Sequence, residues 1–277
     1  MSTPIQAFRT FYARRMAAMA GTPSVEDRLT RAFEAVPREQ FLAKGPWEVY
    51  TPGGYITTPT DDPAFLYEDI IVLLTADGPI NNGQPSLHAA SLGHVNPGYG
   101  ETALHIGAGS GYYTAILAML VGPTGTVVAY EIQRPLADWA AANLATYSNV
   151  TVRNRSGSSG PLPYADVIYV NAGATAPLDI WLDALRPGGR LIFPLTPAEG
   201  VGAMLLVTRR SDESFGASFI SAAMFIGCVG GRDDKTAERL SEAFQRGGME
   251  SVSSLYRNTP VDDTCWFAGD GWWLSTS

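Results

Sequence analysis

An apolar stretch that runs into a glycine-rich turn and then into a helix constrains this 277-residue chain more than any other feature. Residues 104–114 have the sequence LHIGAGSGYYT, with glycines at positions 107, 109 and 111. Glycine has no Cβ and adopts positive φ angles freely, so this spacing allows a sharp turn and close approach by a ligand. The helix predicted for residues 113–121 directs its N-terminal amide groups toward the same place. The stretch therefore predicts a binding site for a nucleotide-type cofactor.

The spacing of the glycines and a following acid indicate which cofactor this is. A dinucleotide-binding turn has another glycine or alanine three positions after its second glycine, and position 112 here is tyrosine. The pattern G-x-G-x-G is instead typical of S-adenosylmethionine-dependent methyltransferases. Glu131 lies twenty positions after Gly111, at the end of a predicted strand, where a carboxylate can accept hydrogen bonds from ribose hydroxyls. Glycine-rich turns also occur for packing alone, but this order of elements favours S-adenosyl-L-methionine.

The rest of the chain alternates predicted strands and helices. After the glycine turn come a helix at 134–147 and strands at 150–152 and 165–170, and the strands are almost continuously apolar. Such strands are typical of a parallel sheet covered by helices on both faces. Two later strand-like runs, 203–208 and 219–229, have the composition of an antiparallel edge. We therefore expect an α/β, Rossmann-like class I methyltransferase fold with a mostly parallel sheet.

Ligands of such sheets bind at the carboxyl ends of the strands, which places the predicted site on one rim. The glycine turn, the acid and the residues that follow the later strands all fall at strand ends. The predicted cofactor-binding residues are His105, Gly107, Ala108, Gly109, Ser110, Gly111, Tyr112, Glu131, Ile132, Ser156, Gly157 and Asn171.

We expect three parts along the chain: an N-terminal helical and loop cap (1–80), the cofactor-binding α/β domain (81–232), and a C-terminal helix with a Trp-rich tail (233–277). In the cap, Ser24 and Asp27 predict a capping box that starts a helix ending before Pro37. Residues 66–74 form a short strand or a helix, which periodicity alone does not distinguish. The tryptophans at 266, 272 and 273 are expected to pack on the sheet edge or on a second subunit of a homodimer.

Composition excludes several other classes of function. The formal net charge of −8 and a pI near 4.9 argue against a nucleic acid partner, which would need clustered Lys and Arg. Two cysteines and three histidines provide neither a disulfide framework nor the spacing of a zinc site, so we expect no metal. No apolar run approaches the ~20 residues of a membrane span, and the N-terminal region lacks the pattern of a signal peptide. These features predict a cytoplasmic protein without a membrane partner.

Four segments together resemble the protein-L-isoaspartate O-methyltransferase family, over roughly residues 31–229. They are AFEAVPREQF at 32–41, GQPSLHA at 83–89, the glycine turn at 106–112, and LRPGGRL at 185–191. The resemblance implies transfer of a methyl group from S-adenosyl-L-methionine to a carboxylate. It also assigns residues 81–85 to the substrate loop, which makes Asn82, Gly83, Gln84 and His88 the candidate catalytic residues.

The chain departs from the family pattern at three polar positions. The substrate loop of the family usually has the sequence T-I-S-Q-P, whereas residues 81–85 are N-N-G-Q-P, so Gly83 stands at the position of the serine. The acid that usually ends the first strand is His105, and the acid of a G-D-G turn beside the adenine falls on Ser156. We expect the glycines and Glu131 to retain cofactor binding, while the differences leave the methyl acceptor open.

Three hypotheses about function remain. The first is an O-methyltransferase for a carboxylate of a protein, peptide or small molecule; a carboxylate is already ionised at neutral pH and needs no general base. The second is a methyltransferase of the same fold for another nucleophile, such as a natural-product intermediate, for which His88 or His105 would be the base. Packing is the alternative role for both histidines. The third is a cofactor-binding protein without transferase activity.

Overall fold

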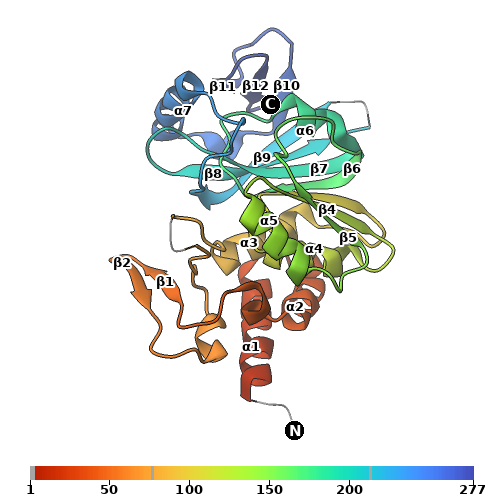
Figure 1. The fold of residues 1–277 in the computed structure, drawn as a ribbon. Coiled ribbons are helices and arrows are strands. Elements are labelled where there is room, and N and C mark those ends of the chain that lie inside the picture. Colours follow the sequence, from red (N-terminus) through yellow and green to blue (C-terminus); the bar gives the residue numbers. More distant parts are fainter. Residues whose placement is uncertain (1–3, 76–77, 212–213) are drawn as a thin grey trace. The chain divides into compact units, whose positions relative to one another are not determined.

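The computed structural model describes residues 4–75, 78–211 and 214–277 of the chain, which forms two compact units. Unit 1 comprises residues 1–101 and 108–155, and unit 2 comprises residues 102–107 and 156–277. Figure 1 shows the elements of both units along the chain. The three-part division expected above stays a prediction, and its residues 1–3, 76–77 and 212–213 lie outside the described residues.

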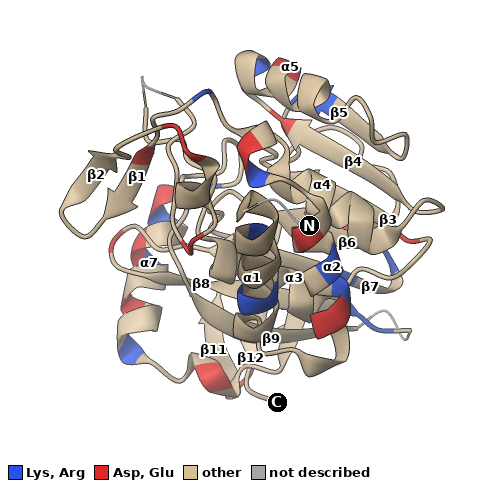
Figure 2. Ribbon diagram, turned by 90° about the horizontal axis from the view of Figure 1, so that it is seen from below, with Lys and Arg blue, Asp and Glu red and all other residues tan. Residues whose placement is uncertain are grey.

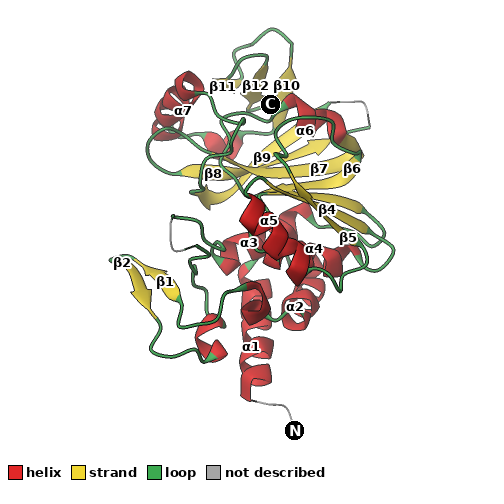
Figure 3. Cartoon of the chain, viewed as in Figure 1, coloured by secondary structure: helices red, strands yellow, loops and turns green. Residues whose placement is uncertain are grey.

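Unit 1 contains five of the described α-helices (Figure 3). Tyr12 of the first packs edge-on against Phe33 of the second, with ring centroids 6.0 Å apart. The predicted apolar face of the second helix is confirmed, because Leu29 and Ala32 are buried with Phe33. The helices are α1 (Pro4–Met19), α2 (Glu26–Ala35), α3 (Pro85–Val95), α4 (Tyr112–Val121) and α5 (Arg134–Asn143), with 3₁₀ turns at Pro23–Val25, Arg38–Phe41 and Pro63–Leu66.

The predicted capping box at Ser24 is wrong. Ser24 lies inside the 3₁₀ turn that begins at Pro23, and the N-cap of α2 is Val25, which has no capping side chain. Proline fixes φ near the helical value, so a turn starts before the serine can adopt the extended conformation of a cap.

The strands of unit 1 form two separate pairs. Strands β4 (Thr126–Glu131) and β5 (Val150–Asn154) are parallel, with Glu131 opposite Asn154. Strands β1 (Glu48–Thr51) and β2 (Gly54–Thr57) form an antiparallel hairpin. The ambiguous segment 66–74 is neither a strand nor a helix beyond its first residue; it is fixed by single bridges from Val72 to β1 and from Leu73 to Asn81.

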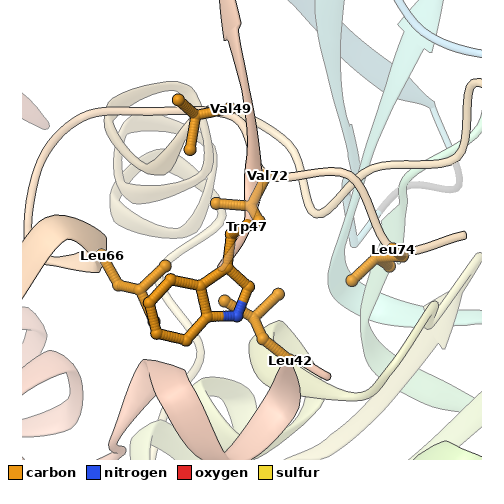
Figure 4. Packing of buried hydrophobic residues seen from close by; sticks show 6 residues of the cluster. All are labelled: Leu42, Trp47, Val49, Leu66, Val72 and Leu74. Atoms are coloured by element: carbon orange, nitrogen blue, oxygen red, sulfur yellow. The ribbon is translucent and has the colours of Figure 1, made fainter. Parts of the chain in front are cut away.

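A hydrophobic cluster anchors this irregular segment in unit 1. Figure 4 shows Trp47 beside Leu66, Leu42 and Val72, with Val49 and Leu74 at the ends of the cluster. All six residues are buried, although they come from the hairpin, a 3₁₀ turn and irregular chain. The cluster therefore fixes the backbone that precedes the candidate substrate loop.

Unit 2 combines a parallel part with an antiparallel part. Strands β3 (Thr102–Ile106), β6 (Ala165–Val170) and β7 (Leu185–Leu195) are neighbours in parallel pairs. The antiparallel part then continues in the order β7, β8 (Gly202–Arg209), β9 (Phe215–Ala223), β10 (Ser254–Arg257), β12 (Trp272–Ser275) and β11 (Cys265–Ala268). Helices α6 (Asp179–Ala184) and α7 (Asp234–Arg246) and a 3₁₀ turn at Met249–Ser251 complete the unit.

The architecture confirms the predicted α/β, Rossmann-like class, including its antiparallel edge. That edge is larger than the sequence indicated, because three strands of the Trp-rich tail extend it. Trp266 packs on the sheet, which was one of the two expected alternatives: it is buried, and its ring centroid lies 5.2 Å from Phe219 and 5.5 Å from Phe244. Trp272 and Trp273 lie within strand β12 itself. Figure 2 shows acidic and basic residues side by side on α7, the helix that carries Phe244. In the described parts of the chain, no helix is both long and apolar enough to cross a membrane.

Candidate functional site

The glycine turn of unit 1 is hydrogen-bonded to the end of strand β4. The Gly109 amide donates to Glu131 Oε2 at 2.9 Å, and the Ala108 amide donates to the Tyr130 carbonyl at 3.1 Å. Gly109 has a φ of +56° and Gly111 a φ of +96°, values that favour glycine. Turn and acid, which the sequence predicts to act together, are therefore in direct contact.

Glu131 is a buried carboxylate that keeps capacity for a ligand. Its Oε1 accepts a hydrogen bond from the Gln133 amide at 2.9 Å, so each oxygen has one protein donor. A carboxylate oxygen can accept two, which leaves a lone pair on each for hydroxyl donors such as those of a ribose. Ile132 follows it with about half of its side chain exposed, and an exposed aliphatic side chain suits the face of an aromatic base.

The three glycines of the turn have different roles. A Cβ on Gly111 would lie 2.8 Å from Leu144 Cδ1 in unit 1, and a Cβ on Gly107 would lie 3.1 Å from the Asn171 carbonyl oxygen in unit 2. At Gly109 the nearest atom would be Leu74 Cδ1 at 3.3 Å. Gly107 and Gly111 thus leave room for neighbouring protein atoms, and the cofactor role of the three glycines stays a prediction.

The side chains of Ser110 and Tyr112 are buried within unit 1. The Tyr112 ring packs against Phe41 and Tyr113, with centroids 5.7 and 4.9 Å away, and burial raises the pKa of its hydroxyl well above the usual value. The Ser110 carbonyl accepts a hydrogen bond from Asn143 at 2.9 Å. These two residues can contribute backbone atoms to a cofactor site, while the Tyr112 side chain belongs to the aromatic core.

In unit 2, His105 and Asn171 form a buried polar pair. Asn171 Nδ2 lies 2.7 Å from His105 Nε2. An amide nitrogen only donates, so the imidazole nitrogen accepts and the ring is neutral. Burial lowers the pKa of His105 to about 3, which agrees with a neutral ring. The bond also fixes the amide of Asn171, whose Oδ1 is buried without a hydrogen-bond partner in the described part of the chain.

The turn at Ser156 and Gly157, also in unit 2, is tightly packed. Ser156 Oγ lies 2.7 Å from Ser158 Oγ and accepts a bond from the Ser158 amide at 3.1 Å. A Cβ on Gly157 would lie 2.6 Å from Ile106 Cγ1, and the Gly157 carbonyl accepts from Trp181 Nε1 at 2.8 Å. The turn is therefore fixed against the end of β3.

The substrate-loop candidates Gly83 and His88 lie in contact in unit 1. Gly83 has a φ of +70°, and a Cβ placed there would be only 1.9 Å from His88 Nε2. The His88 ring is buried and stacks on Tyr113 with centroids 3.7 Å apart and an interplanar angle of 13°. Any side chain at position 83 would therefore displace the imidazole.

Gln84 is held by an acid that sequence reasoning did not single out. Asp69 Oδ2 accepts from Gln84 Nε2 at 2.9 Å and from Ser86 Oγ at 2.7 Å, and Asp69 Oδ1 accepts from the Ser86 amide at 2.8 Å. The acid lies near the N-terminus of α3, where negative charge is favourable. It falls in the irregular segment 66–74, so no periodicity pointed to it.

Arg38 was also missed, although it is fully buried. Its guanidinium donates to Asn82 Oδ1 at 3.3 Å, which connects it to the substrate loop. The one indication in the sequence is an arginine directly after the proline that ends an apolar helix face, in VPREQF.

The structure thus brings the predicted residues together in three groups. Unit 1 contains the pair Gly109 and Glu131 and, separately, the loop of Asn82, Gly83, Gln84 and His88, whereas unit 2 contains His105 with Asn171. The residues predicted to share one rim are divided between the two units, so the common rim stays a prediction.

Comparison with known proteins identifies the family. The family model for protein-L-isoaspartate(D-aspartate) O-methyltransferase matches residues 20–233. The protein-L-isoaspartate O-methyltransferase of Brucella anthropi is 32% identical over 214 residues, which cover 75% of this chain and 88% of the relative. The enzyme of the same name from Thermotoga maritima is 32% identical over 264 residues, covering 88% and 78%.

Solved structures show the same fold. A protein-L-isoaspartate O-methyltransferase is similar with a TM-score of 0.64 at 24% identity, over 88% of this chain and 73% of the other. A putative protein-L-isoaspartate O-methyltransferase from Plasmodium falciparum, solved with S-adenosyl-L-homocysteine, has a TM-score of 0.61 at 17% identity, over 78% and 97%. Motifs, fold and relatives agree, and this chain belongs to the protein-L-isoaspartate(D-aspartate) O-methyltransferase family.

Proposed function

We propose that this chain is an S-adenosyl-L-methionine-dependent O-methyltransferase that methylates a carboxylate of a protein or peptide. The contact between the Gly109 amide and the buried Glu131 carboxylate carries the proposal, because it joins the glycine turn to an acceptor for ribose hydroxyls. Family membership supports the reaction, since the relatives are named for methyl transfer to isoaspartyl protein.

The residues present fit the cofactor by two observations. In unit 1, Glu131 retains a lone pair on each oxygen beside a turn whose Gly109 carries no side chain, and Ile132 presents an exposed aliphatic surface. In unit 2, Asn171 Oδ1 is a buried acceptor that suits an ammonium or hydroxyl donor. We assign Ala108, Gly109, Ser110, Gly111 and Glu131 to the adenosine part, with His105 orienting Asn171. Within unit 1, Tyr112 shapes the backbone of the turn, and within unit 2, Gly107, Ser156 and Gly157 shape the backbone at the ends of their strands.

The mechanism requires little acid–base chemistry from this chain. When bound, the cofactor supplies a methyl group on a positively charged sulfur. A carboxylate acceptor has an unperturbed pKa near 4 and is ionised at neutral pH, so no residue needs to remove a proton. The chain therefore acts by positioning the acceptor and excluding water. This fits His105, whose low pKa keeps it a neutral hydrogen-bond acceptor rather than a base at neutral pH.

The substrate loop is proposed to position the acceptor. Gly83 and His88 define its shape, and Gln84 is held by Asp69, so none of the three needs to transfer a proton. We propose a protein or peptide acceptor rather than a small molecule because the relatives share this acceptor class in their names. The homodimer and the cytoplasmic location remain proposals from the sequence.

The test measures binding and turnover separately. Calorimetry with S-adenosyl-L-homocysteine should give saturable binding by the wild-type protein. Incubation with tritiated S-adenosyl-L-methionine and an isoaspartyl peptide should give base-labile radioactive methanol, and the same peptide with normal aspartate should give much less. Base-stable label would indicate another nucleophile, whereas binding without any turnover would indicate a protein that only binds the cofactor.

A further inference from the structure

A fully buried guanidinium lies beneath the substrate loop in unit 1. Arg38 donates to three main-chain carbonyls of an irregular segment: to Leu66 at 2.7 Å, to Glu68 at 3.1 Å and to Ile70 at 2.5 Å. Its fourth acceptor is Asn82 Oδ1 at 3.3 Å. All four acceptors are neutral oxygens.

The positive charge of Arg38 has no anionic partner among the residues that the structure describes. A buried charge loses its hydration and is stabilised when an opposite charge comes close. Carbonyl dipoles compensate part of this loss. The Asp69 carboxylate bonds to Gln84 and Ser86 instead, so the charged group in direct contact with the Asn82 side chain is Arg38.

The side chain of Asn82 is fixed in one orientation. Its Oδ1 accepts from the Val72 main-chain amide at 2.9 Å as well as from Arg38. The main-chain amide of Asn82 donates to the Val72 carbonyl at 3.0 Å. Val72 itself belongs to the hydrophobic cluster of Figure 4. Because Oδ1 accepts from two donors, the side-chain amide cannot be rotated by 180°, which would bring Nδ2 toward those donors. The Nδ2 group is therefore held away from Val72 N and from the Arg38 guanidinium.

The Nδ2 group of Asn82 is a donor with nothing to bind in the described residues. The residue is only 8% exposed, and its Nδ2 has no hydrogen-bond partner. Such groups are uncommon in folded proteins because losing water without a replacement is costly. The two bonds to Oδ1 also draw electron density from the amide, which makes Nδ2 a stronger donor. Gly83 comes next and offers no side chain to compete.

We propose that Asn82 Nδ2 binds one carboxylate oxygen of the methyl acceptor, with Arg38 as the positioning residue that orients the amide and supplies positive potential. This inference rests on the proposed function. The second carboxylate oxygen forms the bond to the methyl carbon while the carbon–sulfur bond breaks and its electron pair stays on sulfur; no proton moves. Because Nδ2 is enclosed, the acceptor binds with a local shift of the loop and then makes its hydrogen bond away from water.

The substitution Asn82→Asp separates this role from a structural one. Aspartate keeps Oδ1 for Val72 and Arg38 and gives Arg38 an anionic partner, so the fold should be retained. The substitution removes the Nδ2 donor and adds repulsion between the new carboxylate and the carboxylate of the methyl acceptor. The acceptor carboxylate loses charge during the reaction, so its bond to Nδ2 is strongest before methyl transfer, and the loss should appear mainly in KM. We expect KM for the isoaspartyl peptide to rise at least about tenfold, with S-adenosyl-L-homocysteine affinity unchanged.

Asn96→Asp is the matched control. Asn96 is the C-cap of α3, and its Oδ1 accepts from Arg28 at 3.0 Å, a bond that aspartate preserves. This variant should keep the wild-type KM. A folded Asn82→Asp protein with wild-type KM would overturn the inference, because a structural role survives the substitution.

A measurement on the wild-type protein keeps the test decisive if the variant does not fold. In ¹H–¹⁵N spectra, the Asn82 side-chain resonances should move when isoaspartyl peptide is added together with S-adenosyl-L-homocysteine. Unmoved resonances in the presence of bound peptide would refute the inference. If the wild-type protein binds the peptide but does not methylate it, the proposed function fails, and the shift of the Asn82 resonances still decides the inference separately.

Discussion

The imidazole of His88 fills the space that a side chain at Gly83 would occupy, with Nε2 only 1.9 Å from the ideal Cβ position. Stacking on Tyr113 holds the ring there. The family pattern has serine at this position of the loop, so the glycine and the histidine form a matched pair in this chain. A side chain at position 83 therefore requires the imidazole of His88 to move.

The variant Gly83→Ser should be destabilised, because serine adds a clash with His88 to an unfavourable φ of +70°. Each effect typically costs about 1–3 kcal/mol. Urea denaturation measures the loss. In the double variant Gly83→Ser/His88→Ala the clash is absent, so the two changes should be strongly non-additive. Additive losses would mean that the two positions are independent.

The variant Glu131→Gln should bind S-adenosyl-L-homocysteine more weakly. A neutral amide replaces the charged carboxylate, and an NH2 group, which can only donate, replaces one of the two carboxylate oxygens. The expected loss is about 1.5–3 kcal/mol, or roughly 10- to 100-fold in Kd. Calorimetry measures it. Asp138→Asn, an equal loss of charge at an exposed position on α5, is the control and should leave Kd unchanged. Equal affinities for both variants would contradict the assignment of Glu131 to the cofactor site.

Asn171→Ala should weaken S-adenosyl-L-homocysteine binding by removing the buried Oδ1 acceptor. That oxygen can bind the ammonium group in the amino-acid part of S-adenosyl-L-homocysteine. In that case the affinity for 5′-methylthioadenosine, which lacks the amino-acid part, should not change. A parallel loss for both ligands would instead assign Oδ1 to the adenosine, and no loss for either would remove Asn171 from the site. Calorimetry with the two ligands distinguishes these outcomes.

The buried His105 should make stability depend on pH. Its pKa is lowered to about 3 by burial, from 6.5 in the unfolded chain. Below pH 6.5 the unfolded state binds the extra proton, so stability falls as pH decreases toward 3. When the pH is lowered from 7 to 5, this one group should reduce the free energy of unfolding by about 2 kcal/mol. Urea denaturation at both values should show a smaller drop for His105→Asn than for the wild type. An identical drop would show that His105 contributes nothing to the pH dependence.

The variant Arg38→Met should lose stability, because one buried carbonyl, that of Leu66, and two partly buried carbonyls, those of Glu68 and Ile70, would lose their donor. An unsatisfied buried group costs about 1–3 kcal/mol, so a loss of about 3 kcal/mol or more is expected in urea denaturation. Arg38→Lys keeps a donor and the charge and should fall between wild type and Arg38→Met. Unchanged stability for Arg38→Met would show that water reaches these carbonyls.

Local patterns predicted the elements that local interactions determine. Strand β6 has the predicted bounds because its residues are apolar apart from Asp166, and the contact of Glu131 with the glycine turn follows from its place at the end of β4. Helix α5 was predicted to reach residue 147 but ends at Asn143, whose side chain bonds to Ser110 across 33 residues of sequence. No local pattern contains such a bond.

The candidate acceptor site was harder to predict because long-range contacts form it. The segment 66–74 has no regular structure and owes its position to Arg38, the hairpin and the substrate loop. The stacked imidazole of His88 became interpretable only with the φ angle of Gly83. For the same reason Asp69, which organises the loop, carried no recognisable signal, and Arg38 had only its place directly after Pro37.

The position of β12 has a consequence for how the sheet of unit 2 forms. This strand lies between β10 and β11, although it follows both in the sequence. The pairing of this sheet edge is therefore completed only when residues 272–275 enter between two strands that precede them in the chain. Until residues 272–275 are available, β10 keeps an unpaired edge and the surface that will receive Trp272 and Trp273 is uncovered. Detachment of residues 272–275 would therefore expose a strand edge of the kind that promotes aggregation.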